Sequence, residues 1–200
     1  MKDISLFRTV LGRDFNRLAR VLQRHYDLLP GQQIVAQGLM KSWIRFGALR
    51  LFIPFAPINS DRVEVRVLNA GVRDTQGHIC YRWEREFRYP TRTQHTETLT
   101  KPAASANGEY VILDTFAQPP AAVTLKLSVK EDGCALEQVA DGPQFAFFGK
   151  TRIALPGFMC LTTHALERAL SDDAFYTEVT IGHPLLGRLF GYAGELRIEN

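Results

Sequence analysis

The feature that most constrains this chain is a strict alternation of apolar and polar residues, repeated in several short runs. Residues 63–67 place valine at every second position, with Glu64 and Arg66 between them. Residues 79–87 and 123–129 alternate in the same way. A period of two is typical of β-strands with one buried and one solvated face. The pattern therefore predicts a mainly antiparallel β-protein.

Turn signals separate these runs at short intervals, as at residues 74–77 and 132–133. Further strands are expected over residues 32–40, 93–100, 109–116, 134–140, 144–149, 175–181 and 190–198. About eight to ten sequential strands with short connections favour an antiparallel meander. Because a sheet of this size must curl or cover its edges, we predict a strongly curved sheet or half-barrel.

The N-terminus follows a different period. Apolar residues recur every three or four positions over residues 4–26, and arginines fill much of the rest. This spacing predicts an amphipathic helix, with a break near Gly12. We therefore expect one α+β domain over residues 1–200, in which a helical segment (residues 1–30) packs against a β-region (residues 31–200).

The segment Trp43–Phe55 is unusually rich in large apolar side chains and also contains Arg45 and Arg50. A short helix over residues 43–52, ended by Pro54, is expected here. Such a helix either packs on the sheet as part of the core or makes peripheral contact with a membrane surface, where the arginines meet head groups. The core interpretation is favoured because exposed apolar patches are rare on soluble proteins.

The charge distribution gives no sign of a nucleic-acid binder. The chain has 24 basic and 21 acidic residues, a formal net charge of +3. The basic residues are scattered and often stand beside acids, as in residues 82–86. A nucleic-acid partner is therefore not expected, because such proteins gather Lys and Arg on one face.

Several other classes of site and location are also disfavoured. Three widely spaced cysteines without a CxxC motif predict free thiols rather than disulfides or zinc ligands. Nucleotide-binding glycine motifs and short nucleophile motifs are absent, so no cofactor is expected. The first residues lack a signal-peptide pattern, and no uncharged run reaches membrane-spanning length. We therefore expect a soluble, cytoplasmic protein without a transmembrane segment.

The C-terminal run over residues 183–194, HPLLGRLFGYAG, carries a family resemblance. It resembles the close of the bacterial DUF4166 family, and residues 83–87, WEREF, are similar to the family's Trp-x-Arg-x-Phe strand. The opening residues 6–15 also fit, while residues 91–108 look longer than in the family. The resemblance covers most of the chain and implies a domain of unknown function. Fusions of some relatives to reductase-like or membrane domains imply a link to small-molecule or lipid metabolism.

Arg85 is the most informative polar residue. On the expected strand 79–88 it lies two and four residues from Trp83 and Tyr81, so its side chain points to the same, buried side. An unpaired buried charge is very costly, and Asp114 on the next strong strand is the candidate partner. Arg85 is either an anchor for an acidic ligand group in an apolar pocket or half of a structural pair. The second interpretation is favoured, because structural ion pairs are common.

His183 is a candidate acid, base or ligand donor at the end of a strand, where Pro184 follows it. The commoner role for such a histidine is a hydrogen bond to a backbone carbonyl. His164 and Glu167 would share one side of a helix, which the composition of residues 162–170 favours, but would point oppositely on a strand. Without a third ligand in view, this pair predicts no metal site.

Three functions remain open. The first is a module that binds a small apolar or lipid-like molecule, with Arg85 holding an acidic group and Trp83, Tyr81 and Tyr192 lining the site. The second is an enzyme in the same cavity, with His183 as acid or base and Arg85 as an electrostatic stabiliser. The third is an accessory interaction domain with a filled interior.

Overall fold

The computed structural model describes residues 3–51, 53, 56–105, 107–117, 120–130, 133–148 and 151–199. Its strands are β1 (Gln33–Ile44), β2 (Ser60–Arg73), β3 (Ile79–Tyr89), β4 (Arg92–Ala104), β5 (Tyr110–Phe116), β6 (Ala121–Lys130), β7 (Ala135–Phe148), β8 (Thr151–Ala154), β9 (Thr162–Ala169), β10 (Ala174–His183) and β11 (Gly187–Ile198). Its helices are α1 (Leu6–Leu11) and α2 (Arg20–Tyr26), with 3-10 helices η1 (Gly12–Arg17), η2 (Gly47–Leu51) and η4 (Gly157–Met159).

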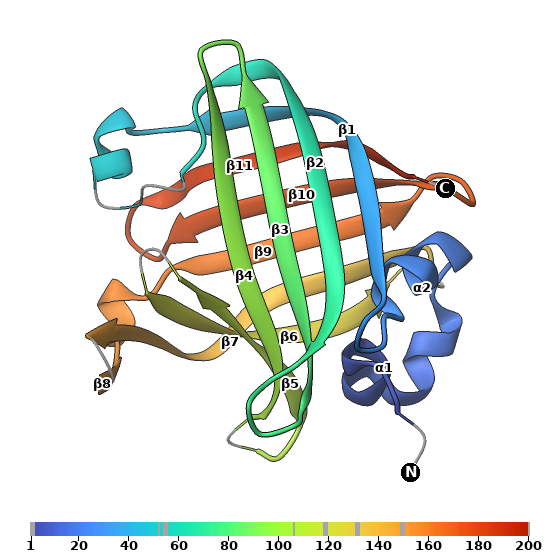
Figure 1. The fold of residues 1–200 in the computed structure, drawn as a ribbon. Helices are drawn as coiled ribbons and strands as arrows, with labels where there is room; N and C mark the ends of the chain where they lie inside the picture. The colour runs from blue at the N-terminus through green and yellow to red at the C-terminus, as the bar shows by residue number, and fades with distance from the viewer. Residues whose placement is uncertain are drawn as a thin grey trace.

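The strands form a closed barrel (Figure 1). Each strand from β1 to β7 pairs antiparallel with the next one, and β7 continues to β9, β10 and β11. The first and last strands then pair with each other from Ala36↔Ile198 to Ile44↔Phe190. Among the described residues ten strands make the ring, and β8 extends it as a hairpin on β7.

The predicted antiparallel class and strand number are confirmed, and the curvature goes further than the half-barrel that we predicted. Pairing of β1 with β11 leaves neither of these strands as an open edge. Full closure is the most effective way to satisfy edge backbone groups, because every N–H and C=O along both edges gains a partner.

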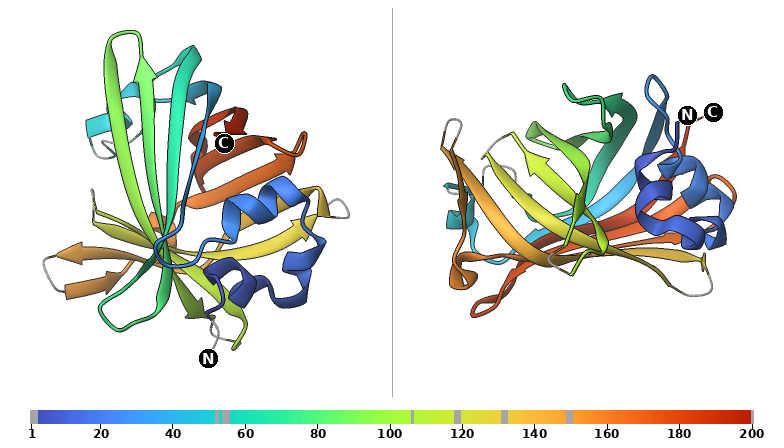
Figure 2. Two further views of the ribbon diagram at one scale, coloured as in Figure 1. Left: turned by 45° about the vertical axis from the view of Figure 1, so that its right-hand side comes forward. Right: turned by 90° about the horizontal axis from the view of Figure 1, so that it is seen from below.

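One end of the barrel is covered by the N-terminal helices (Figure 2). The predicted helix over residues 4–26 is divided into α1, η1 and α2, with Gly12 at φ 55° in the break. Phe7, Phe15 and Tyr26 are fully buried between these helices and the strands. We call this the capped end. No helix in the described ranges is long and apolar enough to cross a membrane.

A glycine in the turn between β6 and β7 lets η1 approach the barrel. Gly133 has φ 100°, and its carbonyl accepts the Ala19 N–H at 2.9 Å. A Cβ at this position would lie 1.8 Å from the carbonyl oxygen of Arg17. Any other residue would therefore push the helical cap away from the strands.

The expected helix over residues 43–52 is wrong. Trp43 and Ile44 complete β1 and pair with Gly191 and Phe190 of β11, and η2 follows as one short 3-10 turn. Residues 52, 54 and 55 of the Trp43–Phe55 segment lie outside the described residues. Residues 162–169 form strand β9, although their composition favours a helix. In both places pairing with a neighbouring strand overrides the local preference of the sequence.

Candidate functional site

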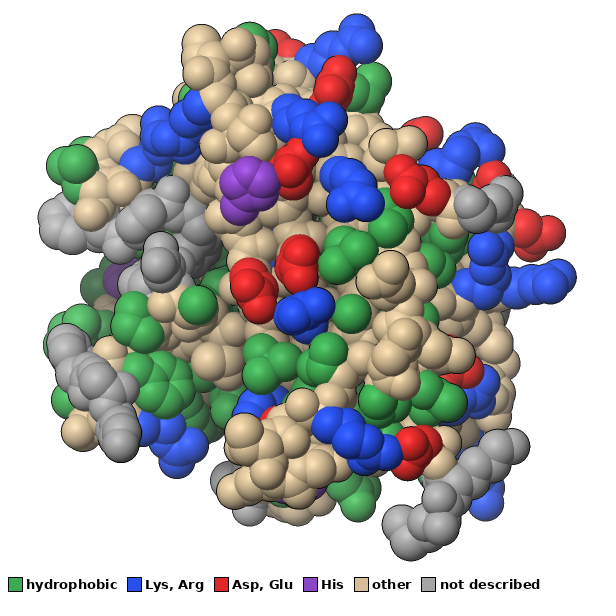
Figure 3. Space-filling view, in the orientation of Figure 1, with side chains coloured by type: hydrophobic (Ala, Val, Ile, Leu, Met, Phe, Trp, Pro, Cys, Tyr) green, Lys and Arg blue, Asp and Glu red, His purple; other side chains and the backbone are tan. Residues whose placement is uncertain are grey.

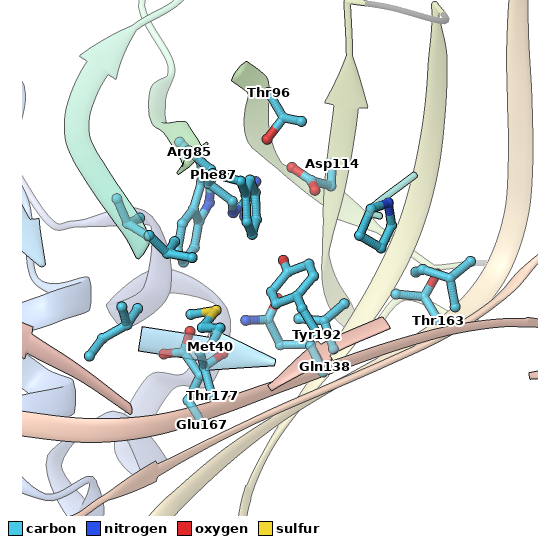
Figure 4. Close-up of a pocket in the computed structure, with 18 of the residues that line it drawn as sticks. Met40, Arg85, Phe87, Thr96, Asp114, Gln138, Thr163, Glu167, Thr177 and Tyr192 are labelled. Atoms are coloured by element: carbon cyan, nitrogen blue, oxygen red, sulfur yellow. The ribbon is translucent and has the colours of Figure 1, made fainter. Parts of the chain in front are cut away.

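A cavity of about 140 Å³ lies inside the barrel (Figure 4). Most of its lining is apolar and comes from side chains that alternate inward along β1–β3, β5, β6 and β9–β11. The main apolar contributors are Met40, Val65, Val67, Trp83, Phe87, Phe116, Leu125, Val179, Ile181, Phe190 and Leu196. Polar groups converge on this apolar space from several strands and from α2, as expected of a ligand site.

Arg85 projects from β3 into this cavity. Its guanidinium carbon lies 4.7 Å from the centre of the Trp83 ring, a cation–π contact. Within the described part of the chain, no hydrogen bond or ion pair to Arg85 is present, and no carboxylate oxygen lies within 4.0 Å. The guanidinium therefore has donors to offer to another molecule.

The charge of Arg85 acts on several titratable groups around it. Burial is the largest cause of each pKa shift around it, and the positive charge of Arg85 then lowers the pKa of six neighbouring groups, namely His25, Tyr26, Tyr81, Asp114, Glu167 and Tyr192. These groups come from α2 and from four different strands. Arg85 thus favours the ionised form of each acidic group near it.

Asp114 reaches the cavity from β5 and is held by a chain of hydrogen bonds. The Trp83 indole N–H donates to the Thr100 hydroxyl at 3.2 Å, and that hydroxyl donates to Asp114 Oδ1 at 2.7 Å. Burial raises the pKa of Asp114, while Arg85 and Thr100 oppose that rise. The expected partnership with Arg85 is therefore electrostatic rather than a direct ion pair, because β4 lies between the two strands.

Glu167 lies at the floor of the cavity, towards the capped end. The Tyr26 hydroxyl donates to Glu167 Oε2 at 2.8 Å and accepts from Gln138 Nε2 at 3.1 Å. Burial raises the pKa of Glu167 to about 7, although hydrogen bonds from Tyr26 and Thr177 and the charge of Arg85 lower it in part. This carboxyl can therefore carry or release a proton near neutral pH.

His25 completes the floor from α2. It is almost fully buried, and its Nε2 lies 3.0 Å from the Asn69 amide nitrogen and 3.9 Å from Glu167 Oε2. Burial, together with the nearby charge of Arg85, lowers the pKa of His25 to about 3. The imidazole is therefore neutral at pH 7 and accepts the amide hydrogen of Asn69.

Four of the six candidate residues line the cavity together: Trp83, Arg85, Asp114 and Tyr192. Tyr81 is fully buried beside them and donates its hydroxyl hydrogen to the His25 backbone carbonyl, outside the cavity lining. His183 lies away from the cavity. Its Nε2 is 2.7 Å from the Phe158 carbonyl oxygen and its Nδ1 accepts the Leu185 N–H. Its position matches the backbone-bonding alternative.

The role of Glu167 was not foreseen from the sequence. On β9 the side chains of Thr163, Ala165 and Glu167 face the cavity, while His164 faces outward and lies 3.1 Å from Glu137 Oε1. On a strand, residues three apart point to opposite faces, so this spacing could have placed His164 and Glu167 on different sides of the sheet. The helical composition of the segment hid that signal. Across the described residues, no group of three or more His, Cys, Asp and Glu side chains is arranged to hold a metal.

Fold and cavity together define a class: a closed up-and-down β-barrel with a mainly apolar interior pocket that holds one arginine and two carboxyl groups. The sequence profile of DUF4166, a domain of unknown function, matches residues 18–196. The chain belongs to this family, which confirms the resemblance of its C-terminal run. No curated protein and no solved structure matches the chain.

Proposed function

We propose that this barrel binds a small, mainly apolar molecule that carries an acidic group. The observation that carries the proposal is Arg85, a guanidinium in an apolar cavity without a hydrogen-bond or ion-pair partner among the described residues. A carboxylate offers the planar, bidentate acceptor that a guanidinium prefers. Binding would supply the partner that such a charge otherwise lacks.

The cavity volume limits the size of the molecule. An apolar cavity of about 150 Å³ holds a single benzene ring, and the cavity here is about 140 Å³. The buried part of the ligand is therefore the size of one ring or a short alkyl chain. Longer molecules would have to extend out of the barrel. The presence of this cavity also argues against an accessory domain with a filled interior.

The two carboxyl groups of the cavity are compatible with a bound anion. Burial raises the pKa of both Asp114 and Glu167, so their neutral forms are favoured more than in water. A neutral carboxyl group does not repel a bound carboxylate, and it can donate a hydrogen bond to one of its oxygens. A bound carboxylate therefore meets less repulsion from Asp114 and Glu167 than it would from ordinary carboxylates in water.

Titration calorimetry with a matched pair of probes tests this proposal. We expect 3-phenylpropionate to bind and 3-phenylpropanol, which has the same ring and chain, to bind at least tenfold more weakly. Arg85→Met should abolish the difference between the two probes. Arg88→Met is the matched control, since Arg88 lies on the same strand but points to solvent. Equal affinity for both probes in the wild type would exclude Arg85 as the anchor.

Glu167 favours a second candidate function, proton transfer within the same cavity. A buried carboxyl group with a pKa of about 7 has the property that a general acid or base needs. Arg85 would stabilise negative charge that develops on the substrate. Mass spectrometry of a molecule that co-purifies with the protein distinguishes the two. Conversion of this molecule by wild type but not by Glu167→Gln supports catalysis, whereas its recovery unchanged from both supports binding alone.

A further inference from the structure

Three segments meet at the end of the barrel that lies opposite the helices: residues 45–51 and 53 around η2, residues 151–161 around β8 and η4, and the turn at residues 183–188 (Figure 1). Arg45 Nη1 donates to the Leu186 carbonyl at 2.7 Å, and His183 Nε2 lies 2.7 Å from the Phe158 carbonyl oxygen. These contacts tie the three segments into one surface, which we call the rim.

Large apolar side chains are exposed on this rim. Leu51 is 81% exposed, Leu185 80% and Phe158 67%. Four more exposed apolar residues belong to the same three segments, namely Phe46, Ile153, Met159 and Leu186. Single exposed leucines are ordinary, but a group of seven at one end of a molecule is typical of an interaction surface.

The charge of the rim has one sign. Its three segments contain Arg45, Arg50, Arg152 and Arg188, and no Asp or Glu occurs in residues 45–53, 151–161 or 183–188. In Figure 3 hydrophobic and basic side chains share the left-hand edge of the molecule. Within the described residues, none of these four arginines has an ion-pair partner. The rim is therefore both apolar and cationic.

We propose that the rim docks on the surface of an anionic phospholipid bilayer. The apolar side chains would enter the boundary between head groups and acyl chains, and the arginines would meet lipid phosphates. A second copy of this chain fits the rim less well. A symmetric dimer would bring both sets of unpaired arginines into one interface, where like charges repel.

The rim is also continuous with the wall of the cavity. Ile181 and Phe190 line the cavity, and they belong to a small apolar cluster with Leu49 and Ile53 of the rim. A docked barrel would therefore hold this part of its cavity wall next to the lipid phase. Docking itself does not depend on the proposed ligand, so the two can be tested separately.

Co-sedimentation with vesicles tests the docking. We expect the wild-type protein to bind vesicles of phosphatidylcholine mixed with phosphatidylglycerol, to bind pure phosphatidylcholine weakly, and to be released by salt. Leu186→Glu should lower partitioning roughly tenfold, through loss of buried apolar area. Its control is Leu170→Glu at the capped end, because the two leucines are 51% and 49% exposed.

A second pair of variants tests the charge. Arg188→Glu should lower partitioning about fivefold or more, since each cation near an anionic surface contributes on that order. Arg13→Glu, at an exposed position of η1, should leave partitioning unchanged. All four variants change exposed side chains and should unfold at the same urea concentration as the wild type. Binding of 3-phenylpropionate without vesicles should also stay the same in all four.

Three results would overturn the proposal. The first is absence of binding to anionic vesicles by the folded wild type. The second is an equal loss of binding from variants at the two ends of the barrel. The third is a concentration-dependent dimer that Leu186→Glu dissociates, which would assign the rim to contacts between copies of this chain.

Discussion

The two ends of the barrel are built from the same strands but are covered differently. At the capped end, several arginines pair with acids, as Arg8 does with Asp27 and Arg73 with Asp3. At the rim, within the described residues, arginines have no acidic partner and large apolar side chains are exposed. The comparison indicates that stability is concentrated at the capped end, while the rim is free to meet another surface.

The cavity lies between these ends and has features of both. Its floor contains Glu167 and His25, which are held by hydrogen bonds from Tyr26 and Asn69. Its wall towards the rim is apolar, with Phe190 and Ile181. A rigid polar floor beneath an apolar wall is the arrangement that orients a molecule with one polar end.

The largest expected effect is the difference in unfolding free energy between substitutions at the two ends. Phe7 is fully buried against Tyr26 and Tyr81, with ring centres 4.2 and 5.2 Å away. Phe7→Ala should lower the free energy of unfolding by about 3–5 kcal/mol, through lost burial and the cavity left behind. Phe158→Ala at the rim should change it by less than about 0.5 kcal/mol. Urea unfolding measures both, and similar losses would refute the division into two kinds of end.

The next effect concerns how stability depends on pH. The pKa of Glu167 is raised to about 7 in the folded protein, so its contribution to stability is complete below its unfolded pKa and is lost as pH rises to 7. The pKa of His25 is lowered to about 3, so its contribution is complete above its unfolded pKa and is lost as pH falls. Between about pH 4.5 and 6.5, a rise in pH therefore lowers the free energy of unfolding through Glu167 and raises it through His25.

Glu167→Gln removes the contribution of Glu167 to this pH dependence. Relative to the wild type, the variant should gain about 3 kcal/mol of unfolding free energy as pH rises from 4.5 to 7. Urea unfolding at a series of pH values measures this gain. Glu64→Gln, on the exposed outer face of β2, should follow the wild-type curve. A parallel curve for Glu167→Gln would mean that Glu167 ionises as it does in the unfolded chain.

Much of the barrel could be predicted from alternation alone. Residues 63–67, 79–87 and 123–129 showed the period of two, and the same parity placed Trp83 and Arg85 inside. Parity is reliable there because a one-residue slip would turn every apolar side chain outward. Closure was not predictable, because it depends on pairing between β1 and β11, whose residues are far apart in the sequence.

The floor of the cavity was not predictable for a related reason. His25 belongs to an amphipathic helix and Glu167 to a segment of helical composition, and neither stands near the other in the sequence. Their meeting depends on how α2 packs over β9 and β10. Similarly, η2 was expected to be a longer helix, because the sequence does not reveal that residues 43–44 extend a strand.

A smaller effect tests the polar floor. The Tyr26 hydroxyl is shared between Glu167 and Gln138. Tyr26→Phe should therefore cost about 2 kcal/mol of unfolding free energy, since it leaves a buried acceptor and a buried donor without partners. Tyr192→Phe is the control, because within the described residues no hydrogen bond of the Tyr192 hydroxyl is found. Equal costs for the two variants would show that the floor adds no stability.

The last prediction is a small effect on stability from Arg85 itself. A structural ion pair loses about 3–5 kcal/mol when one partner is removed, because the other charge stays buried and uncompensated. The guanidinium of Arg85 has no direct carboxylate partner among the described residues, and methionine can fill the same apolar space beside Trp83. Arg85→Met should therefore change the free energy of unfolding by less than about 1 kcal/mol, while it removes binding of the carboxylate probe. If Arg85→Met instead loses several kcal/mol of unfolding free energy and still binds the probe, Arg85 has a structural role and is not the ligand anchor.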